Sequence, residues 1–343
     1  MGLIYAGIAP FVGGFRMHMM SPITFIQNPL LWLKLMSKHS VNWSTAPNFA
    51  YKLVIRKYNE AVGAVGDGNN NDKEPFRKRS NRKKMKQVVG INDTEERKSL
   101  IFSGGLDLSS IHHLSNGTEP IHLDTKDQFE KAFSKYGLQS NWFYTGYGLA
   151  ENVVGCCWIQ GLHISSPTAS STATTNSTTM NESVNSHKQS GDGQNHPQHQ
   201  QQKFIAVGSR STFAKDLIVK IANPETNCEV PDGTTGELWI TGPSVAAGYF
   251  GKPEASQEVF CARLLPTTDI NTTYLRTGDL AFFEDDKLFI CGRIKDLIIV
   301  NGVNYYPQDI EYTIQQALPD DAVRPGCVAA FSHNDAGKGG DII

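Results

Sequence analysis

The segment from residue 274 to residue 311 constrains the fold more than any other part of this 343-residue chain. It contains two apolar runs of strand length, residues 288–290 and 297–300. The dipeptides Asp285-Asp286 and Asn301-Gly302 lie beside these runs, and both are typical of tight turns. Asn-Gly is the strongest short hairpin signal. The segment therefore predicts short strands joined by hairpin turns.

A helix is expected immediately after these strands. Pro307 suits the first turn of a helix, and Asp309 and Glu311 then lie near its positive end. Apolar residues recur at helical spacing, at Ile310, Ile314, Ala317 and Leu318. Upstream, a proline-started helix is expected over residues 30–36, and Phe129, Phe133 and Tyr136 indicate an amphipathic helix. The alternation through Leu238 and Ile240 predicts a half-buried strand.

Composition excludes several classes of protein. The net charge of −2 gives no field that would favour nucleic acid as a partner. The six cysteines show no Cys-x-x-Cys pair and no metal-ligand spacing, which is typical of reduced cytosolic thiols. No apolar run is long enough for a transmembrane segment. We expect a cytoplasmic protein, unless a targeting sequence is missing with the N-terminus.

Two polar segments interrupt the chain, at about 60–98 and 165–202. The first is rich in Asn, Lys and Arg, and the second consists largely of Ser, Thr, Asn, Gln and His. Segments with so little to bury cannot offset the entropy of ordering, so both are expected to be disordered insertions. The basic run at 77–86 lacks interleaved aromatic residues, which favours a solvated loop over a nucleic-acid site.

Three glycine-containing polar motifs carry the chemistry. They are Asn116-Gly117-Thr118, Tyr147-Gly148-Leu-Ala-Glu151, and Thr277-Gly278-Asp279 followed by Gly292-Arg293-Ile-Lys295. Glycine lets a backbone approach a flat ring closely. A carboxylate accepts hydrogen bonds from two vicinal hydroxyls, and a guanidinium is permanently charged and fork-shaped. Each motif alone is weak evidence for a function, and the order of the three motifs along the chain is the stronger evidence.

In this order the motifs resemble the adenylate-forming, or AMP-binding, superfamily of acyl-CoA synthetases, luciferases and peptide-synthetase adenylation domains. The nearest branch is the fatty acyl-AMP ligases, which share the Gly-Leu-Ala-Glu form ending at Glu151. The run from Gly236 to Tyr249 and the run from Asn304 to Glu311 also resemble that branch. Thr118 departs from the alanine that is usual there.

The resemblance implies roles for individual residues. Asp279 would bind the ribose hydroxyls of ATP, Arg293 would reach the nucleotide, and Lys295 would be the hinge of a rotating C-terminal domain; these are the expected catalytic residues. Glu151 would help to hold Mg²⁺. The expected nucleotide-binding residues are Asn116, Gly117, Thr118, Tyr147, Gly148, Asp279 and Arg293. We expect Asp279, Arg293, Tyr147 and Glu151 to converge on one pocket at a domain boundary.

The implied fold is α/β. Residues 1–294 would form part of an adenylate-forming large domain, with α/β sheets and a small β-barrel. Residues 295–343 would begin a small α+β C-terminal lid. The family's phosphate loop and lid lysine are not found in this sequence. The chain is therefore expected to be a fragment and to be inactive alone.

The implied function is ATP-dependent activation of a fatty acid to an acyl-adenylate, with release of pyrophosphate. ATP and Mg²⁺ would be the cofactors. The acyl group would then pass to the thiol of an acyl carrier protein or of a polyketide synthase carrier domain. The alternatives are an acyl-CoA synthetase of the same superfamily and a non-catalytic, adenylation-like interaction domain.

Overall fold

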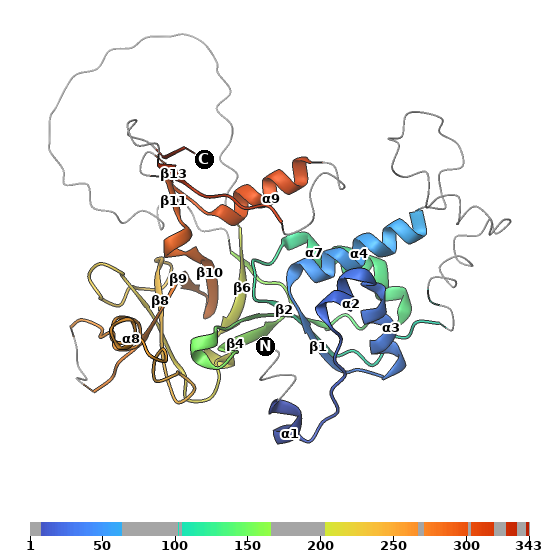
Figure 1. Cartoon of the computed structure of the whole chain (residues 1–343), viewed down its shortest axis with the longest axis horizontal. Coiled ribbons are helices and arrows are strands. Elements are labelled where there is room, and N and C mark those ends of the chain that lie inside the picture. The colour runs from blue at the N-terminus through green and yellow to red at the C-terminus, as the bar shows by residue number, and fades with distance from the viewer. Residues whose placement is uncertain are drawn as a thin grey trace, which may run out of the picture. The chain divides into compact units, whose positions relative to one another are not determined.

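The computed structural model describes residues 8–63, 102, 105–165, 203–266, 271–300, 303–318, 327–334 and 341–342. Its contacts divide the chain into two compact units (Figure 1): Met1–Leu162 with Pro307–Ala330, and His163–Tyr306 with Phe331–Ile343. The division predicted between 294 and 295 stays a prediction. The predicted insertions lie outside the described residues, except that 60–63 end a helix and Ser165 belongs to a strand.

The first unit is built on a four-stranded sheet in the order β1-β2-β3-β4. Strands β1 (Trp43–Ala46), β2 (His113–Gly117) and β3 (Phe143–Tyr147) run parallel, and β4 (Cys157–Gln160) is antiparallel to β3. Parallel neighbours require crossover connections. The helix α4 (Asn48–Gly63) follows β1, and α7 (Leu123–Phe133) joins β2 to β3. The expected α/β class is confirmed.

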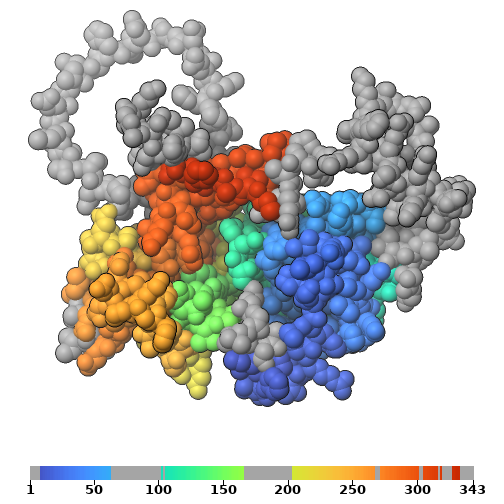
Figure 2. All heavy atoms as spheres, viewed as in Figure 1, coloured from blue at the N-terminus to red at the C-terminus, as the bar shows by residue number. Residues whose placement is uncertain are grey.

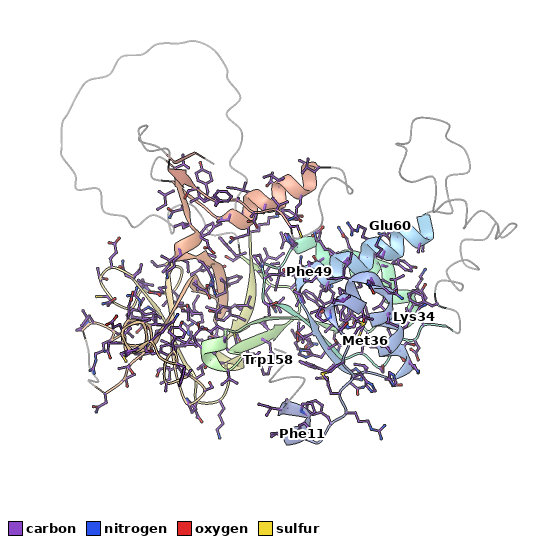
Figure 3. The ribbon with its side chains drawn as sticks, viewed as in Figure 1. Phe11, Lys34, Met36, Phe49, Glu60 and Trp158 are labelled. Carbon is purple, nitrogen blue, oxygen red and sulfur yellow. The ribbon has the colours of Figure 1, made fainter. Side chains whose placement is uncertain are left out.

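Helices supply the other half of this unit's core. Leu33 of α3 (Leu30–Lys38), Tyr51 of α4 and Phe129 of α7 are fully buried in one cluster with Leu114 and Phe143 of the sheet. Two short helices, α1 (Ala9–Gly13) and α2 (Pro22–Gln27), precede α3. Figure 2 shows the blue atoms of α2, α3 and α4 closely packed. By contrast, Phe11 of α1 is 91% exposed (Figure 3).

The predicted helices at 30–36 and around Phe129 are confirmed. The second one is shorter than expected, because α7 ends at Phe133 and Tyr136 belongs to the 3-10 turn η3 (Ser134–Tyr136). The helix expected from Pro307 is α9 (Pro307–Ala317), whose contacts place it in the first unit.

The second unit contains a six-stranded sheet in the order β5-β6-β10-β9-β8-β7. Its strands are β5 (Ile164–Ser165), β6 (Phe204–Ser209), β7 (Ile218–Ala222), β8 (Gly236–Thr241), β9 (Leu275–Glu284) and β10 (Lys287–Arg293). The turn predicted at Asp285-Asp286 joins β9 to β10. Both residues have positive φ, 48° and 66°, as a two-residue type I′ hairpin requires.

Two expectations for this unit are wrong. Strand β8 is not half-buried, because every residue from Gly236 to Ile240 is buried and the carboxylate of Glu237 lies inside. The small barrel is not closed either. A barrel requires its first and last strands to pair, and no pairing joins β5 to β7 among the residues that the structure describes.

The remaining elements are short. Strands β11 (Ile298–Val300) and β12 (Val303–Tyr305) pair with Val300 opposite Val303, so they form the hairpin predicted around 301–302, although those two residues lie outside the described ones. Helix α8 (Pro253–Phe260) precedes β9, and β13 (His333–Asn334) pairs with β14 (Asp341–Ile342). The 3-10 turns η4 (Ala150–Asn152), η6 (Arg210–Thr212) and η7 (Ile294–Asp296) complete the described chain. No described helix is both long and apolar enough to cross a bilayer.

Candidate functional site

A pocket of about 320 Å³ lies against the sheet of the first unit. Its lining includes the predicted binding residues Asn116, Gly117, Thr118, Tyr147 and Gly148. They come from separate motifs, which meet because β2 and β3 are parallel neighbours with Gly117 opposite Gly146. Ligands of α/β sheets bind outside the carboxyl ends of the strands, and both motifs lie at those ends.

The glycines of these motifs allow close backbone contacts. A Cβ on Gly117 would lie 2.6 Å from the carbonyl oxygen of Gly146. A Cβ on Gly148 would lie 1.7 Å from the carbonyl oxygen of Val154. Real Cβ atoms do not approach so closely, so this part of the pocket wall is made of bare backbone.

The sequence did not predict the other wall of the pocket. It includes Trp43 of β1, His113 and Ser115 of β2, and Trp158 of β4 (Figure 3). The Nε2 atom of His113 lies 2.6 Å from the hydroxyl of Ser115, and its ring stacks on Tyr144 with centroids 3.7 Å apart. Burial lowers the pKa of His113 to about 4, so the imidazole is neutral at pH 7. The period-two alternation of β2, running back from Gly117, is the signal that could have identified His113 and Ser115.

The start of α4 holds the Asn116–Gly117–Thr118 turn in place. The amide of Asn116 donates to Oδ1 of Asn48 at 3.0 Å, and both side chains are buried. On the other side of the turn, the carboxylate of Glu119 accepts the backbone N–H of Phe49. Figure 3 labels Phe49 near the first residue of α4. The turn is therefore fixed from both sides by one helix terminus.

Glu151 lies in η4 and is partly buried. Among the described residues, no group of three or more His, Cys, Asp and Glu side chains could hold a metal ion by itself. Magnesium commonly takes one or two carboxylates together with phosphate oxygens and water. A lone carboxylate such as Glu151 is compatible with Mg²⁺ only when phosphate oxygens and water complete the ligands, and its role as a magnesium ligand stays a prediction.

In the second unit, the structure brings Asp279 and Arg293 together. They lie opposite each other on β9 and β10, and the Nε of Arg293 donates to Oδ1 of Asp279 at 3.0 Å. The side chain of Asp279 is 7% exposed, whereas that of Arg293 is 64% exposed. The pair thus combines a carboxylate that is held in place with a guanidinium that solvent can reach.

A buried carboxylate supports the Thr277-Gly278-Asp279 turn. One oxygen of Glu237 accepts the N–H of Gly278 at 3.1 Å. The other accepts hydrogen bonds from Nε of Arg276 and from the indole of Trp239, both at 2.9 Å. This role of Glu237 was not predicted from the sequence. An acidic residue inside the apolar run of β8 was the available signal.

Lys295 is exposed in η7, between β10 and β11. Its role as a hinge stays a prediction. Tyr147 and Glu151 belong to the first unit, and Asp279 and Arg293 belong to the second. Their convergence on one pocket also stays a prediction.

Residues 1–250 match the family model described as AMP-binding enzyme, and this range contains the pocket motifs. The chain belongs to the AMP-binding enzyme family. The resemblance inferred from the motifs is thereby confirmed. The family match also includes β8, where Glu237 lies.

Similar proteins of this family include fatty-acid ligases. The chain is 33% identical over 340 residues to long-chain-fatty-acid–AMP ligase FadD26 of Mycobacterium marinum, covering 98% of the chain and 47% of the relative. It is 32% identical over 335 residues to FadD21 of Mycobacterium tuberculosis, which is named as a fatty-acid–CoA ligase, with coverage of 97% and 47%. The chain thus spans about half the length of the curated relatives it matches.

Solved structures give the same result. The fatty acyl-adenylate ligase of Legionella pneumophila, in complex with acyl adenylate and pyrophosphate, is 30% identical with a TM-score of 0.59. The comparison covers 97% of this chain and 48% of that protein. McyG A-PCP, complexed with phenylalanyl-adenylate, has a TM-score of 0.66 at 24% identity, which supports the fold alone.

Proposed function

We propose that the protein containing this chain activates a fatty acid with ATP. A carboxylate oxygen of the fatty acid attacks the α-phosphorus. The bond from that phosphorus to the bridging oxygen breaks, and pyrophosphate leaves with the bonding electrons. The product is a mixed anhydride, the acyl-adenylate.

The observation that carries this proposal is the pocket shared by the Asn116–Gly117–Thr118 turn and the Tyr147-Gly148 motif. A flat base fits against the bare backbone at Gly117, and the ring of Tyr147 offers it a stacking surface. We assign this pocket to the adenine of ATP. The relative that was solved with acyl adenylate and pyrophosphate supports the assignment.

We assign charged residues of the motifs to the rest of the nucleotide. The carboxylate of Asp279 is buried and held by Arg293, so it is preorganised to accept hydrogen bonds from two ribose hydroxyls. Two anions must meet in the reaction, so positive charge near the phosphates lowers the barrier. Arg293 supplies such a charge from an exposed side chain. Mg²⁺, when bound through Glu151, would neutralise further phosphate charge.

A carrier-protein thiol is the acceptor that we propose for the acyl group. The likeness to FadD26, which is named as an AMP ligase, favours this acceptor, and the motif wording around Glu151 agrees with it. Coenzyme A is the second candidate, because FadD21 is named as a CoA ligase.

Binding of a stable acyl-adenylate mimic tests the nucleotide site directly. We would titrate the 343-residue chain with dodecanoyl sulfamoyl adenosine and compare it with Asp279→Asn. Loss of charge-assisted hydrogen bonds of about 1.5–3 kcal/mol predicts affinity roughly ten- to hundredfold weaker. Asp232→Asn is the matched control, because Asp232 is a 57% exposed carboxylate that pairs with Arg210.

Two outcomes would contradict the proposal. Equal affinities of Asp279→Asn and the unchanged chain would remove Asp279 from the site. The absence of any binding by the unchanged chain would contradict the assignment of the pocket to adenine.

A further inference from the structure

Thr118 has an unusual backbone conformation. Its φ is +71°, in the left-handed region that glycine adopts freely. For a β-branched residue this conformation is a genuine outlier, because the Cβ crowds the neighbouring carbonyl. The strain lies within the pocket lining, between Gly117 and Glu119.

The surroundings explain how the strain persists. Asn116 is tied to Asn48, and Glu119 is tied to the backbone of Phe49, so the residues on both sides of the turn are anchored to α4. Gly117 cannot shift toward β3, since its backbone already lies close to Gly146. Strained residues persist where the structure over-determines them, and such residues cluster at ligand sites.

A glycine at position 118 would adopt this conformation without strain, so the threonine side chain calls for a reason of its own. Thr118 is exposed, and it lines the pocket together with Tyr147 and Gly148. Within the described part of the chain, no hydrogen bond occupies its hydroxyl. A hydroxyl both donates and accepts, so it suits a polar group at the edge of a base that lies against Tyr147.

We propose that the Thr118 hydroxyl hydrogen-bonds to the base of the bound adenylate. This inference rests on the proposed function, because it takes the pocket to be the adenine site. Thr118 thus contacts the ligand through its side chain, in addition to the backbone contact that its motif implies. The contact increases affinity, whereas the strained backbone of Thr118 lowers the stability of the free protein.

Three substitutions separate the hydroxyl from the backbone strain. Thr118→Ser keeps the hydroxyl, Thr118→Val keeps the shape and the strain without the hydroxyl, and Thr118→Gly removes both. For each 343-residue variant we would measure Tm and the Kd of dodecanoyl sulfamoyl adenosine. A neutral hydrogen bond predicts affinity about three- to tenfold weaker for Thr118→Val and Thr118→Gly, and nearly unchanged for Thr118→Ser. Thr118→Gly should also raise Tm above that of the unchanged chain.

Opposite changes of Tm and affinity in Thr118→Gly are the distinctive expected result, because simple damage to the fold would lower both. Unchanged affinity in Thr118→Val would overturn the inference and leave the proposed function intact, provided that Asp279→Asn still weakens binding. A Tm of Thr118→Gly at or below that of the unchanged chain would overturn the claim of strain. Failure of the unchanged chain to bind would overturn the proposed function and this inference together.

Discussion

Individual buried polar residues maintain the geometry of the predicted motifs in each unit. Glu237 is 2% exposed and satisfies donors from Arg276, Trp239 and Gly278. Breaking a buried ion pair is costly, because the remaining charge is left without its partner. The Thr277-Gly278-Asp279 turn therefore depends on one carboxylate in a neighbouring strand.

We expect Glu237→Ala to lower the free energy of unfolding of the second unit by about 3 kcal/mol, the lower end for a buried pair, because Arg276 is partly exposed. Denaturant unfolding followed by tryptophan fluorescence measures this loss. Glu229→Ala is the control, since Glu229 pairs with Lys220 at 2.9 Å but is 50% exposed. Surface pairs contribute about 0–1 kcal/mol. Equal losses in the two variants would contradict the role of Glu237.

Two histidines of the first unit predict a pH dependence. Burial lowers the pKa of His113 to about 4 from 6.5. The pKa of His122 is also lowered to about 4, mainly because the ring is buried and secondly because Lys52 is positively charged. The unfolded state therefore binds more protons than the folded state between pH 6.5 and about 4. Stability is lost as the pH falls through that window, and it is fully present above pH 6.5.

The measurement is Tm against pH for the unchanged chain and for the double variant His113→Phe/His122→Phe. The double variant should lose less Tm between pH 7 and pH 4.5. Exposed His112→Ala is the control and should follow the unchanged chain. Parallel curves for the double variant and the unchanged chain would show that the two imidazoles do not titrate as we expect.

At the scale of elements, the end of β3 depends on a glycine for steric reasons. A Cβ on Gly148 would overlap the carbonyl oxygen of Val154, at 1.7 Å. We expect Gly148→Ala to displace this turn, lower Tm and weaken binding of the adenylate mimic. Gly233→Ala is a useful comparison, because Gly233 has φ of +80° and nothing within 4 Å of an added Cβ.

Gly233→Ala should cost only the conformational penalty of about 1–2 kcal/mol and should leave binding unchanged. Gly148→Ala should lower Tm by more than Gly233→Ala does. It should also weaken binding of the adenylate mimic, which Gly233→Ala should not do. A milder effect at Gly148 than at Gly233 would mean that the turn has room to adjust.

Tyr312 of helix α9 packs against other residues of the first unit. The ring of Tyr312 stacks on His122 with centroids 4.4 Å apart, and the ammonium of Lys52 lies 5.1 Å from its centroid. Aromatic and cation–π contacts of this kind contribute about 0.5–1.5 kcal/mol each. We expect Tyr312→Ala to loosen α9 and to speed amide hydrogen exchange along it.

Ile314→Ala on the same helix is the control, because Ile314 is 39% exposed. Unchanged exchange in Tyr312→Ala would show that other contacts hold the helix.

At the scale of the whole molecule, the acceptor of the acyl group separates the two candidate enzyme classes. We expect the protein that contains this chain to load dodecanoyl groups onto a phosphopantetheinylated carrier protein and to form little dodecanoyl-CoA. Mass spectrometry of both thioesters after incubation with ATP and dodecanoate measures the ratio. Efficient formation of the CoA thioester would reverse the choice of acceptor but retain the adenylation step.

Several elements could be predicted from local signals. The dipeptide Asp285-Asp286 was sufficient to predict a hairpin turn, and Pro307 was sufficient to predict the start of a helix. The apolar spacing around Phe129 was sufficient to predict another helix. The burial of β8 could not be predicted, because its alternation of Leu238 and Ile240 does not reveal what covers the opposite face. Likewise, His113 and Ser115 carry no motif, and only the pairing of β2 with its neighbours places them in the pocket.

The sequence by itself determined the family and the residues of its motifs, because those depend on residue type and order along the chain. Only the tertiary structure decided which motifs share a pocket, because strand pairing sets the distance between segments far apart in sequence. Tertiary contacts also decided the conformation of Thr118. Asn48 and Phe49, distant along the chain, hold that turn in a backbone region that threonine disfavours by itself.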